Sequence, residues 1–290
     1  MIPPLPHSPL GAQASFTLGG SATEQGFVFG DVSSGPQEVF VGCRASITAP
    51  WSLLPFYSPA PGRPEPLSKG RFGRFLAAAG DKWMIGPLVL KLCSPFEISN
   101  AVQDERFWYA PVVCGYLEYD NSHNDETAEV VFGVSGEAPA RGANSASGFD
   151  FDGTHGFATA STAEVRAART GDVVSSDAGP VSALLFTVPA ASKRIFPLVL
   201  GFFHPGFFYT ELFSGLRDVL DFGLLNHAQY LACADALDAE FMRSQAPFDQ
   251  KTSGAHALRS WLATSRRLAG QPALDVDPLR ALWRSLVAPN

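Results

Sequence analysis

Short runs of alternating apolar and polar residues follow one another from about residue 15 to about residue 203. In the run 127–135, for example, Val130, Phe132 and Val134 would share one face of a strand. Glycine, proline, aspartate and asparagine separate the runs, and no helical period lies between them. We expect strands at 37–43, 51–57, 72–78, 84–93, 111–119, 127–135, 181–188 and 193–203. This succession predicts a mainly β fold built as an antiparallel two-sheet β-sandwich.

The spacing of apolar residues changes to a helical period after Gly206. Phe208, Leu212, Leu216 and Leu220 recur at every fourth residue, as on one face of an amphipathic helix. We expect three further helices, at about 224–241, 253–269 and 277–290. The chain therefore divides into an expected β-sandwich domain at 1–206 and a short α-helical region at 207–290.

The last expected helix has a well-marked start. Asp277 is a suitable N-cap, and Pro278 fits the first helical position because its missing N–H would have no partner there. An apolar stripe then runs to the end of the chain through Leu279, Leu282, Trp283, Leu286 and Val287. This ordered ending favours a chain that stops here by evolution over an accidental truncation.

Two segments lack the alternating pattern. The first, 59–69, contains four prolines and predicts an extended excursion over the surface. The second, 138–148, consists mainly of small and polar residues, and we expect it to form a mobile loop.

Composition narrows the range of partners. Of the 290 residues, 46% are hydrophobic and 17% charged, which is typical of a globular protein and not of a disordered one. The net charge of -7 argues against nucleic acid and against anionic membranes, because both select basic surfaces. It is compatible with a neutral or small ligand.

Neither a leader nor a metal site is evident in the sequence. Residues 1–9 lack the cationic and apolar regions of a signal peptide, and no run of about 18 apolar residues is present, so we expect a cytoplasmic protein without membrane contact. The four cysteines, Cys43, Cys93, Cys114 and Cys233, are scattered without metal-ligand spacing. We expect buried free thiols in the strand regions, no bound metal and no cofactor.

The opening segment 7–19 reads His-Ser-Pro-Leu-Gly-Ala-Gln-Ala-Ser-Phe-Thr-Leu-Gly. Pro9 and Gly11 indicate a tight turn, and Ala14, Phe16 and Leu18 indicate a strand with one buried face. The segment resembles the N-terminal signature of the glycoside hydrolase family 52 β-xylosidases.

Further segments resemble this family in the same order along the chain. They include Asp81-Lys82-Trp83 with the strands around it, and His256-Ala257-Leu258-Arg259-Ser260-Trp261, which is similar to the helix that begins the family's second domain. The other matching segments lie at 39–42, 54–56, 75–95, 111–121, 181–189 and 208–210. The resemblance covers about residues 7–268, and the ordered series is more specific than any one segment.

The resemblance implies a retaining, exo-acting enzyme that releases xylose from xylo-oligosaccharides in xylan degradation. In the family, a β-supersandwich supports an (α/α)6 barrel that carries both catalytic carboxylates, so 207–290 would be a helical linker and the remnant of that barrel. The nucleophilic glutamate would follow the helix at 256–261, but no glutamate occurs after Glu240. The aspartate that acts as general acid would lie beyond the last residue. Relative to the family the chain is truncated, and we expect no catalytic residue in it.

Carboxylate pairs within the chain offer an alternative source of catalysis. A retaining glycosidase needs two carboxyl groups about 5 Å apart, and Asp150 with Asp152, or Glu118 with Asp120, could share a strand face. An Asp-Gly turn at 152–153 is the more common meaning of such a pattern. The oxygen-rich segment 120–126 could similarly hold Ca²⁺, but it lacks the glycine and glutamate of an EF-hand loop and favours a polar hairpin turn.

Among the six histidines, His7 is the best candidate for binding a substrate, because it precedes a constrained turn and such turns position side chains. We therefore expect His7 to contact a sugar, although the turn could serve only the packing of domains. His204 fits a turn or an interface, and His256 fits helix packing. Aromatic residues such as Trp51, Trp83 and Trp108 could stack on a sugar ring, although core packing is their more frequent role.

These observations favour the N-terminal supporting domain of a family 52-like β-xylosidase that is inactive alone. The alternative is a non-catalytic carbohydrate-binding or assembly module, and a third possibility is that a separately encoded barrel completes the site. A xylo-oligosaccharide or another neutral sugar is the expected ligand. The expected helices would leave an apolar stripe only partly covered, so we also expect self-association or a partner chain at the helical end.

Overall fold

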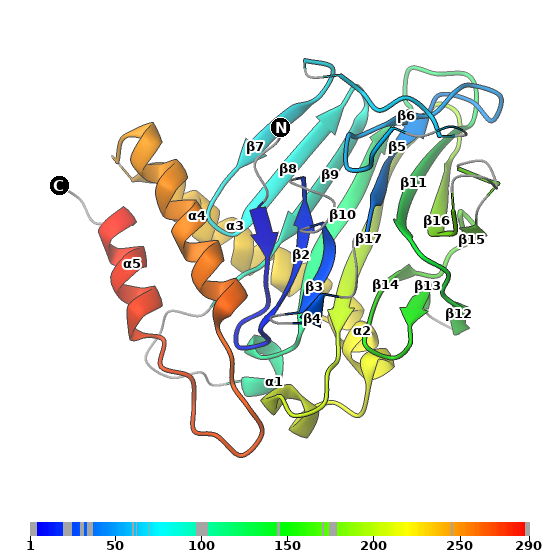
Figure 1. The fold of residues 1–290 in the computed structure, drawn as a ribbon. Helices are drawn as coiled ribbons and strands as arrows, with labels where there is room; N and C mark the ends of the chain where they lie inside the picture. Colours follow the sequence, from blue (N-terminus) through cyan, green and yellow to red (C-terminus); the bar gives the residue numbers. More distant parts are fainter. Residues whose placement is uncertain are drawn as a thin grey trace.

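Figure 1 shows the fold in a computed structural model that describes residues 5–19, 25–29, 32–33, 37–59, 61, 63–68, 70–96, 104–143, 146–169, 171–173, 179–244 and 246–287. Its described strands form three sheets of eight, five and four strands, and all of their pairings are antiparallel. The predicted mainly β, antiparallel fold is confirmed.

The largest sheet has the strand order β12-β13-β14-β17-β10-β9-β8-β7. Its strands are β7 (Gly73–Leu76), β8 (Gly80–Ile85), β9 (Leu88–Cys93), β10 (Val112–Asp120), β12 (Ala140–Ala143), β13 (Ala146–Phe151), β14 (His155–Ala160) and β17 (Lys193–Phe202). The run 84–93, expected as one strand, is divided by a turn at Gly86, whose φ of 52° lies in the left-handed region that glycine adopts without strain.

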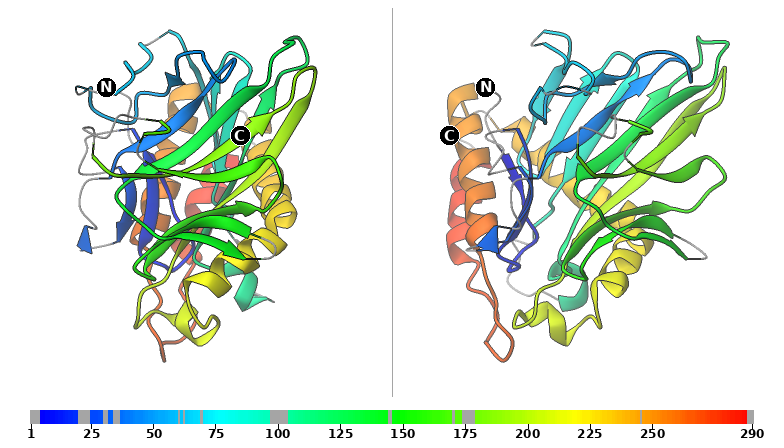
Figure 2. Two further views of the ribbon diagram at one scale, coloured as in Figure 1. Left: turned by 90° about the vertical axis from the view of Figure 1, so that its right-hand side faces the viewer. Right: turned by 45° about the vertical axis from the view of Figure 1, so that its right-hand side comes forward.

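The second sheet has the order β15-β16-β11-β5-β6. It consists of β5 (Val39–Arg44), β6 (Ser52–Leu53), β11 (Ala128–Ser135), β15 (Val165–Arg169) and β16 (Val181–Val188). It packs face to face on the large sheet, as Figure 2 shows. The ring centroids of Phe132 and Phe157 lie 5.2 Å apart across this interface, and those of Phe186 and Phe196 lie 4.7 Å apart.

Strand β11 has both faces buried. Val130, Phe132 and Val134 point into the main core, and Val131 on the other face joins a smaller cluster with Phe40. The second cluster explains why the outer face of this strand carries the apolar Val131 between Glu129 and Gly133.

The segment 138–148 is not the loop that the sequence predicts. Strand β12 and the start of β13 lie within it and pair with each other, for example Ala140 with Phe149. Small residues such as Ala and Gly show no alternation of polarity, so the sequence pattern does not reveal these strands. Backbone hydrogen bonds between the two strands hold them together. Residues 144–145 lie outside the described residues. The described residues of 59–69, by contrast, contain no helix or strand.

A third sheet, of four strands, was not predicted, although the strand expected at Ala14, Phe16 and Leu18 is confirmed as its β2. It consists of β1 (Leu5–His7), β2 (Ala14–Leu18), β3 (Gly26–Phe29) and β4 (Val32–Ser33), in that order. Its aromatic side chains pack against the sandwich, since Phe16 lies 6.1 Å from Phe132 and Phe27 lies 5.4 Å from Phe202 between ring centroids.

The helices follow the predicted order after Gly206, but the stretch 208–220, expected as one helix, is divided into a 3-10 helix and a later α-helix. They are the 3-10 helix η3 (Phe208–Glu211), α2 (Leu216–Leu225), α3 (His227–Arg243), α4 (Phe248–Thr264) and α5 (Asp277–Val287). Among the described residues of the β region, the single-turn α1 (Glu105–Trp108) is helical, and Asp104 caps it through a 3.0 Å hydrogen bond from the Phe107 N–H. Within the described residues, no helix has the length and apolarity that crossing a membrane requires.

Helices α2 and α3 pack on the outer face of the large sheet, and α4 with α5 stands beside the small sheet (Figures 1 and 2). Glycine permits the close approach of α2, because a Cβ at Gly201 would lie 2.8 Å from Leu220. The apolar stripe of α5 is largely covered, since Trp283 packs against Phe96 and Phe241 at centroid distances of 5.4 and 6.5 Å.

Candidate functional site

The opening turn lies against the end of α4, although more than 250 residues separate them in sequence. Gly11 donates its backbone N–H to Ser265 Oγ at 2.9 Å, and the Gln13 N–H donates to the Ser265 carbonyl at 2.9 Å. The Gly11 carbonyl in turn accepts from the Arg267 N–H at 2.9 Å. Gly11 has a φ of 72°, and an added Cβ would meet the Tyr109 ring at 3.3 Å, so this position requires glycine.

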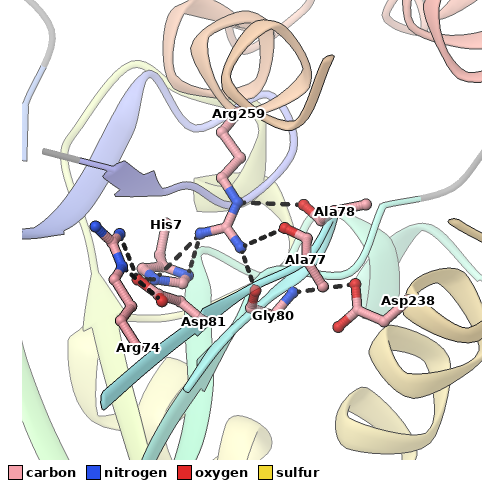
Figure 3. A network of polar contacts seen from close by, with 8 residues as sticks. All are labelled: His7, Arg74, Ala77, Ala78, Gly80, Asp81, Asp238 and Arg259. Carbon is pink, nitrogen blue, oxygen red and sulfur yellow. Dashed lines mark hydrogen bonds and ion pairs between the residues drawn. The ribbon is translucent and has the colours of Figure 1, made fainter. Parts of the chain in front are cut away.

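His7, on β1 just before this turn, lies at the centre of a buried polar cluster (Figure 3). Nη1 of Arg259 on α4 is 3.3 Å from each His7 ring nitrogen. On the other side, His7 Nε2 lies 3.8 Å from Asp81 Oδ2 on β8. The side chains of His7 and Asp81 have no exposed surface.

Arg259 joins α4 to the turn between β7 and β8. Its guanidinium donates to the backbone carbonyls of Ala78 at 3.2 Å, Ala77 at 3.1 Å and Gly80 at 2.6 Å (Figure 3). The residue is only 2% exposed. Ala77 and Ala78 follow β7, and Gly80 begins β8, so the two strands hold these carbonyls in place. The carbonyls form an acceptor set that suits the planar guanidinium group of arginine.

Two carboxylates balance the buried cations. Asp81 accepts from Arg74 Nε at 3.0 Å and from Arg74 Nη2 at 2.8 Å, a bidentate pair. Asp238 on α3 accepts from the Ala79 N–H at 2.7 Å and from the Gly80 N–H at 3.3 Å. We call the set His7, Arg74, Asp81, Asp238 and Arg259 the buried joint.

Burial and charge set the protonation states in the joint. Desolvation, reinforced by Arg259, lowers the pKa of His7 from 6.5 to about 4, so the ring is neutral near pH 7. Burial alone would raise the pKa of Asp81, but His7, Arg74 and Arg259 hold it well below its usual range. Burial lowers the pKa of Arg259 to about 10, against the attraction of Asp81, and it raises the pKa of Asp238. Near pH 7 the joint therefore combines the Arg259 cation, the Asp81 carboxylate and a neutral His7 imidazole.

The sequence matches a known protein family over most of its length. A family model described as glycosyl hydrolase family 52 matches residues 16–277. The chain belongs to this family. Two curated relatives, both named beta-xylosidase and both from Geobacillus stearothermophilus, are 25% and 24% identical to it over 93% of this chain. The alignments cover 53% and 46% of those proteins, so this chain spans about half their length.

The joint brings together segments that carry the family 52 resemblance. His7 comes from the opening signature, Asp81 from Asp81-Lys82-Trp83, and Arg259 from the helical segment 256–261. These three side chains lie far apart in sequence and form one contact network between the small sheet, the large sheet and α4. The joint therefore connects α4 to both the small sheet and the large sheet.

The structure does not place His7 at a surface. Because the ring is completely buried, a ligand could reach it only if α4 or β1 moved away. Contact of His7 with a sugar stays a prediction, and the contacts observed are those of domain packing. His204 and His256 lie outside the joint: His204 Nδ1 is 3.0 Å from the Pro205 carbonyl, and His256 is half-buried on α4.

The candidate carboxylate pairs are held in local structure. Asp150 Oδ1 accepts from the Gly153 N–H at 2.6 Å, and Asp152 has a φ of 54° in the same turn. This is the Asp-Gly turn that the sequence favours. Glu118 forms an ion pair with Lys193 at 2.8 Å, and Asp120 accepts from its neighbour Ser122.

The oxygen-rich segment 120–126 is not the hairpin turn that the sequence favours, because it connects β10 of the large sheet to β11 of the five-stranded sheet and these two strands do not pair. Asn121, which is buried, donates to the carbonyls of Glu126, Val188 and Pro189 at 2.8, 3.2 and 3.0 Å. Its amide thus ties the turn to the neighbouring strand. In the described part of the chain, no group of three or more histidine, cysteine, aspartate or glutamate side chains is placed to hold a metal ion.

Sequence reasoning missed the central role of Arg259. The available signal was a cation on the apolar stripe of α4, between Leu258 and Leu262, which are both buried. A charged side chain at such a position must find partners inside the protein. It also missed the buried pair of Gln37 Nε2 and His155 Nε2, 2.9 Å apart, whose residues are distant in sequence and carry no shared motif.

Proposed function

We propose that this chain is the N-terminal supporting module of a family 52 glycoside hydrolase that acts on β-xylosides. The observation that carries the proposal is the buried joint, which locks the β part onto α4. By resemblance, α4 is the helix that begins the family's catalytic domain. The names of the two relatives support xylo-oligosaccharide as the substrate of the complete enzyme, and a cytoplasmic location is part of the same proposal.

The proposal includes the inactivity of this chain alone. A retaining glycosidase uses a nucleophilic carboxylate and an acid-base carboxylate about 5 Å apart beside the substrate. The candidate pairs examined above are tied into turns and ion pairs, and the sequence has no glutamate after Glu240. A supporting module needs neither group.

The direct experiment is hydrolysis of 4-nitrophenyl β-D-xylopyranoside by the purified full chain. We expect release of nitrophenol at the rate of buffer alone, for the wild type and for Asp150→Asn and Asp152→Asn alike. Release well above buffer that disappears in Asp150→Asn or Asp152→Asn would contradict the proposal and assign catalysis to that pair.

A supporting module needs a contact surface for the catalytic half of the enzyme. We infer that α4 and α5 present the contact surface, because Trp261 and Leu282 remain half-buried on these helices. The second candidate function is that of an assembly module, in which an unrelated protein or a second copy of the chain binds to this surface. Titration with xylobiose separates this from carbohydrate binding: a saturable heat would favour a carbohydrate-binding module, and its absence would favour assembly.

A further inference from the structure

A groove of about 490 Å³ lies between the edge strand β7 and the helices α3 and α4. Phe72, Leu76 and Trp83 line it on the sheet side, and Phe241, Met242 and Phe248 line it on the helix side. This volume and this apolar, largely aromatic lining are those of a small-molecule site. The groove adjoins the buried joint through Arg74, whose guanidinium carbon lies 4.4 Å from the centre of the Trp83 ring.

The groove contains one imidazole that can accept a hydrogen bond, His256, and its other polar side chains, Arg74, Lys251, Thr252 and the Trp83 indole, are mainly hydrogen-bond donors. Lys251 on α4 donates to the Met242 carbonyl at 3.0 Å, which uses one of its three N–H groups. Trp83 is 1% exposed, and within the described chain its indole N–H has no hydrogen-bond partner. Thr252 already donates its hydroxyl to the Phe248 carbonyl at 3.0 Å. No aspartate, glutamate, asparagine or glutamine is among the described residues that line the groove.

This donor set selects the chemistry of the ligand. A sugar presents hydroxyl groups that both donate and accept, so a sugar site requires strong acceptors such as carboxylates or amides. A carboxylate only accepts, and it forms its strongest hydrogen bonds with cationic donors. We propose that the groove binds an amphipathic carboxylate, with its apolar body among the aromatic rings and its carboxylate group at Lys251.

The charges also distinguish this ligand from a second copy of the chain. Phe248 is 81% exposed and Met242 is 45% exposed at the rim, so the groove is accessible. A symmetric contact through the groove would place Lys251 and Arg74 of one copy near the same residues of the other. Such like charges oppose association, whereas an acidic small molecule neutralises Lys251. The inference does not depend on glycosidase activity.

The test uses the five tryptophan indole N–H signals of the full ¹⁵N-labelled chain. Sodium 4-phenylbutyrate is the probe, and 4-phenylbutan-1-ol is its neutral counterpart. Trp83→Phe assigns the Trp83 signal. We expect 4-phenylbutyrate to shift that signal in a saturable manner, whereas the alcohol binds at least about tenfold more weakly because it lacks the charge-assisted hydrogen bond. Equal binding of acid and alcohol, or no shift of the Trp83 signal, would overturn the proposal.

Two variants locate the carboxylate. Lys251→Gln should raise the dissociation constant of 4-phenylbutyrate about tenfold. Lys82→Gln is the matched control, because Lys82 precedes Trp83 on β8 and points to the opposite face of the sheet; it should leave the constant unchanged. If Lys251→Gln disturbs the other indole signals, Phe248→Ser provides a substitution at an exposed position and should also weaken binding. If the variant that keeps the native spectrum binds 4-phenylbutyrate as tightly as the wild type does, the groove is not the binding site. A concentration-dependent dimer that prevents binding of 4-phenylbutyrate would also overturn the proposal.

Discussion

Arg259 illustrates how one residue can connect distant parts of the chain. It lies on α4, is 2% exposed, and reaches three backbone carbonyls at the turn between β7 and β8 as well as the ring of His7. Neither Asp81 nor Asp238 is an ordinary surface carboxylate, because Asp81 is buried, Asp238 is half-buried, and the charge of Arg259 acts to lower the pKa of both. Removing one member therefore leaves the others in an apolar environment without their partners.

Substitution Arg259→Met should lower the free energy of unfolding by about 3–5 kcal/mol, the usual cost of leaving a buried charge unpaired. Urea denaturation followed by circular dichroism measures this. Arg284→Met is the matched control, because Arg284 is exposed on α5, and it should change the free energy by less than about 0.5 kcal/mol. Equal small effects in the two variants would show that the joint contributes little to stability.

His7 should make stability depend on pH. The folded chain protonates His7 only near pH 4, whereas an unfolded histidine binds its proton near 6.5, so acidification between these values favours the unfolded state. The shift corresponds to about 3 kcal/mol of unfolding free energy lost from pH 7 to pH 4. His155, whose pKa burial also lowers to about 4, should contribute in the same direction.

The measurement is urea denaturation at several pH values between 7 and 4. His7→Gln should flatten the slope in this range, because the amide cannot take up the proton. His123→Gln should retain the wild-type slope, since His123 is exposed in the 120–126 turn. A slope that is the same in His7→Gln and in the wild type would contradict the buried, neutral state of His7.

At the scale of elements, the sequence predicted most of the helices and strands that carry a regular spacing of apolar residues. Strand β11 and helix α5 match because each carries a regular apolar face that is buried in the fold. Strands β12 and β13 were missed because small residues leave no alternation, and the four-stranded sheet was missed because its contacts are set by tertiary packing. The joint could not be predicted for a similar reason: its members are far apart in sequence, and only the folded chain brings them into contact.

Association at the helical end remains a prediction at this scale. Trp283 is 2% exposed and is part of the core, so its substitution would test folding and not association. Leu282, half-buried on the same helix, is the better position. We expect light scattering at micromolar concentration to show a mass above that of the monomer, and Leu282→Glu to reduce it. A monomer of constant mass in both proteins would mean that α4 and α5 close the surface on their own.

For the whole molecule, the described β sheets and α4 are joined into one packed unit. The small sheet and the sandwich share one core, and α4 is attached to both through the joint and the opening turn. The chain spans about half the length of its curated relatives, and the proposal assigns to this half the positioning of a catalytic domain. That assignment requires that no residue of the chain act as a glycosidase nucleophile.

The most direct test is covalent trapping. Retaining glycosidases form a covalent glycosyl-enzyme intermediate on their nucleophile, and 2,4-dinitrophenyl 2-deoxy-2-fluoro-β-D-xyloside is designed to make that intermediate accumulate. Intact-mass spectrometry of the full chain after incubation with this compound should show the unmodified mass alone. A stoichiometric adduct of one fluoroxylosyl group, mapped to a carboxylate of this chain, would contradict the supporting role and identify an active glycosidase.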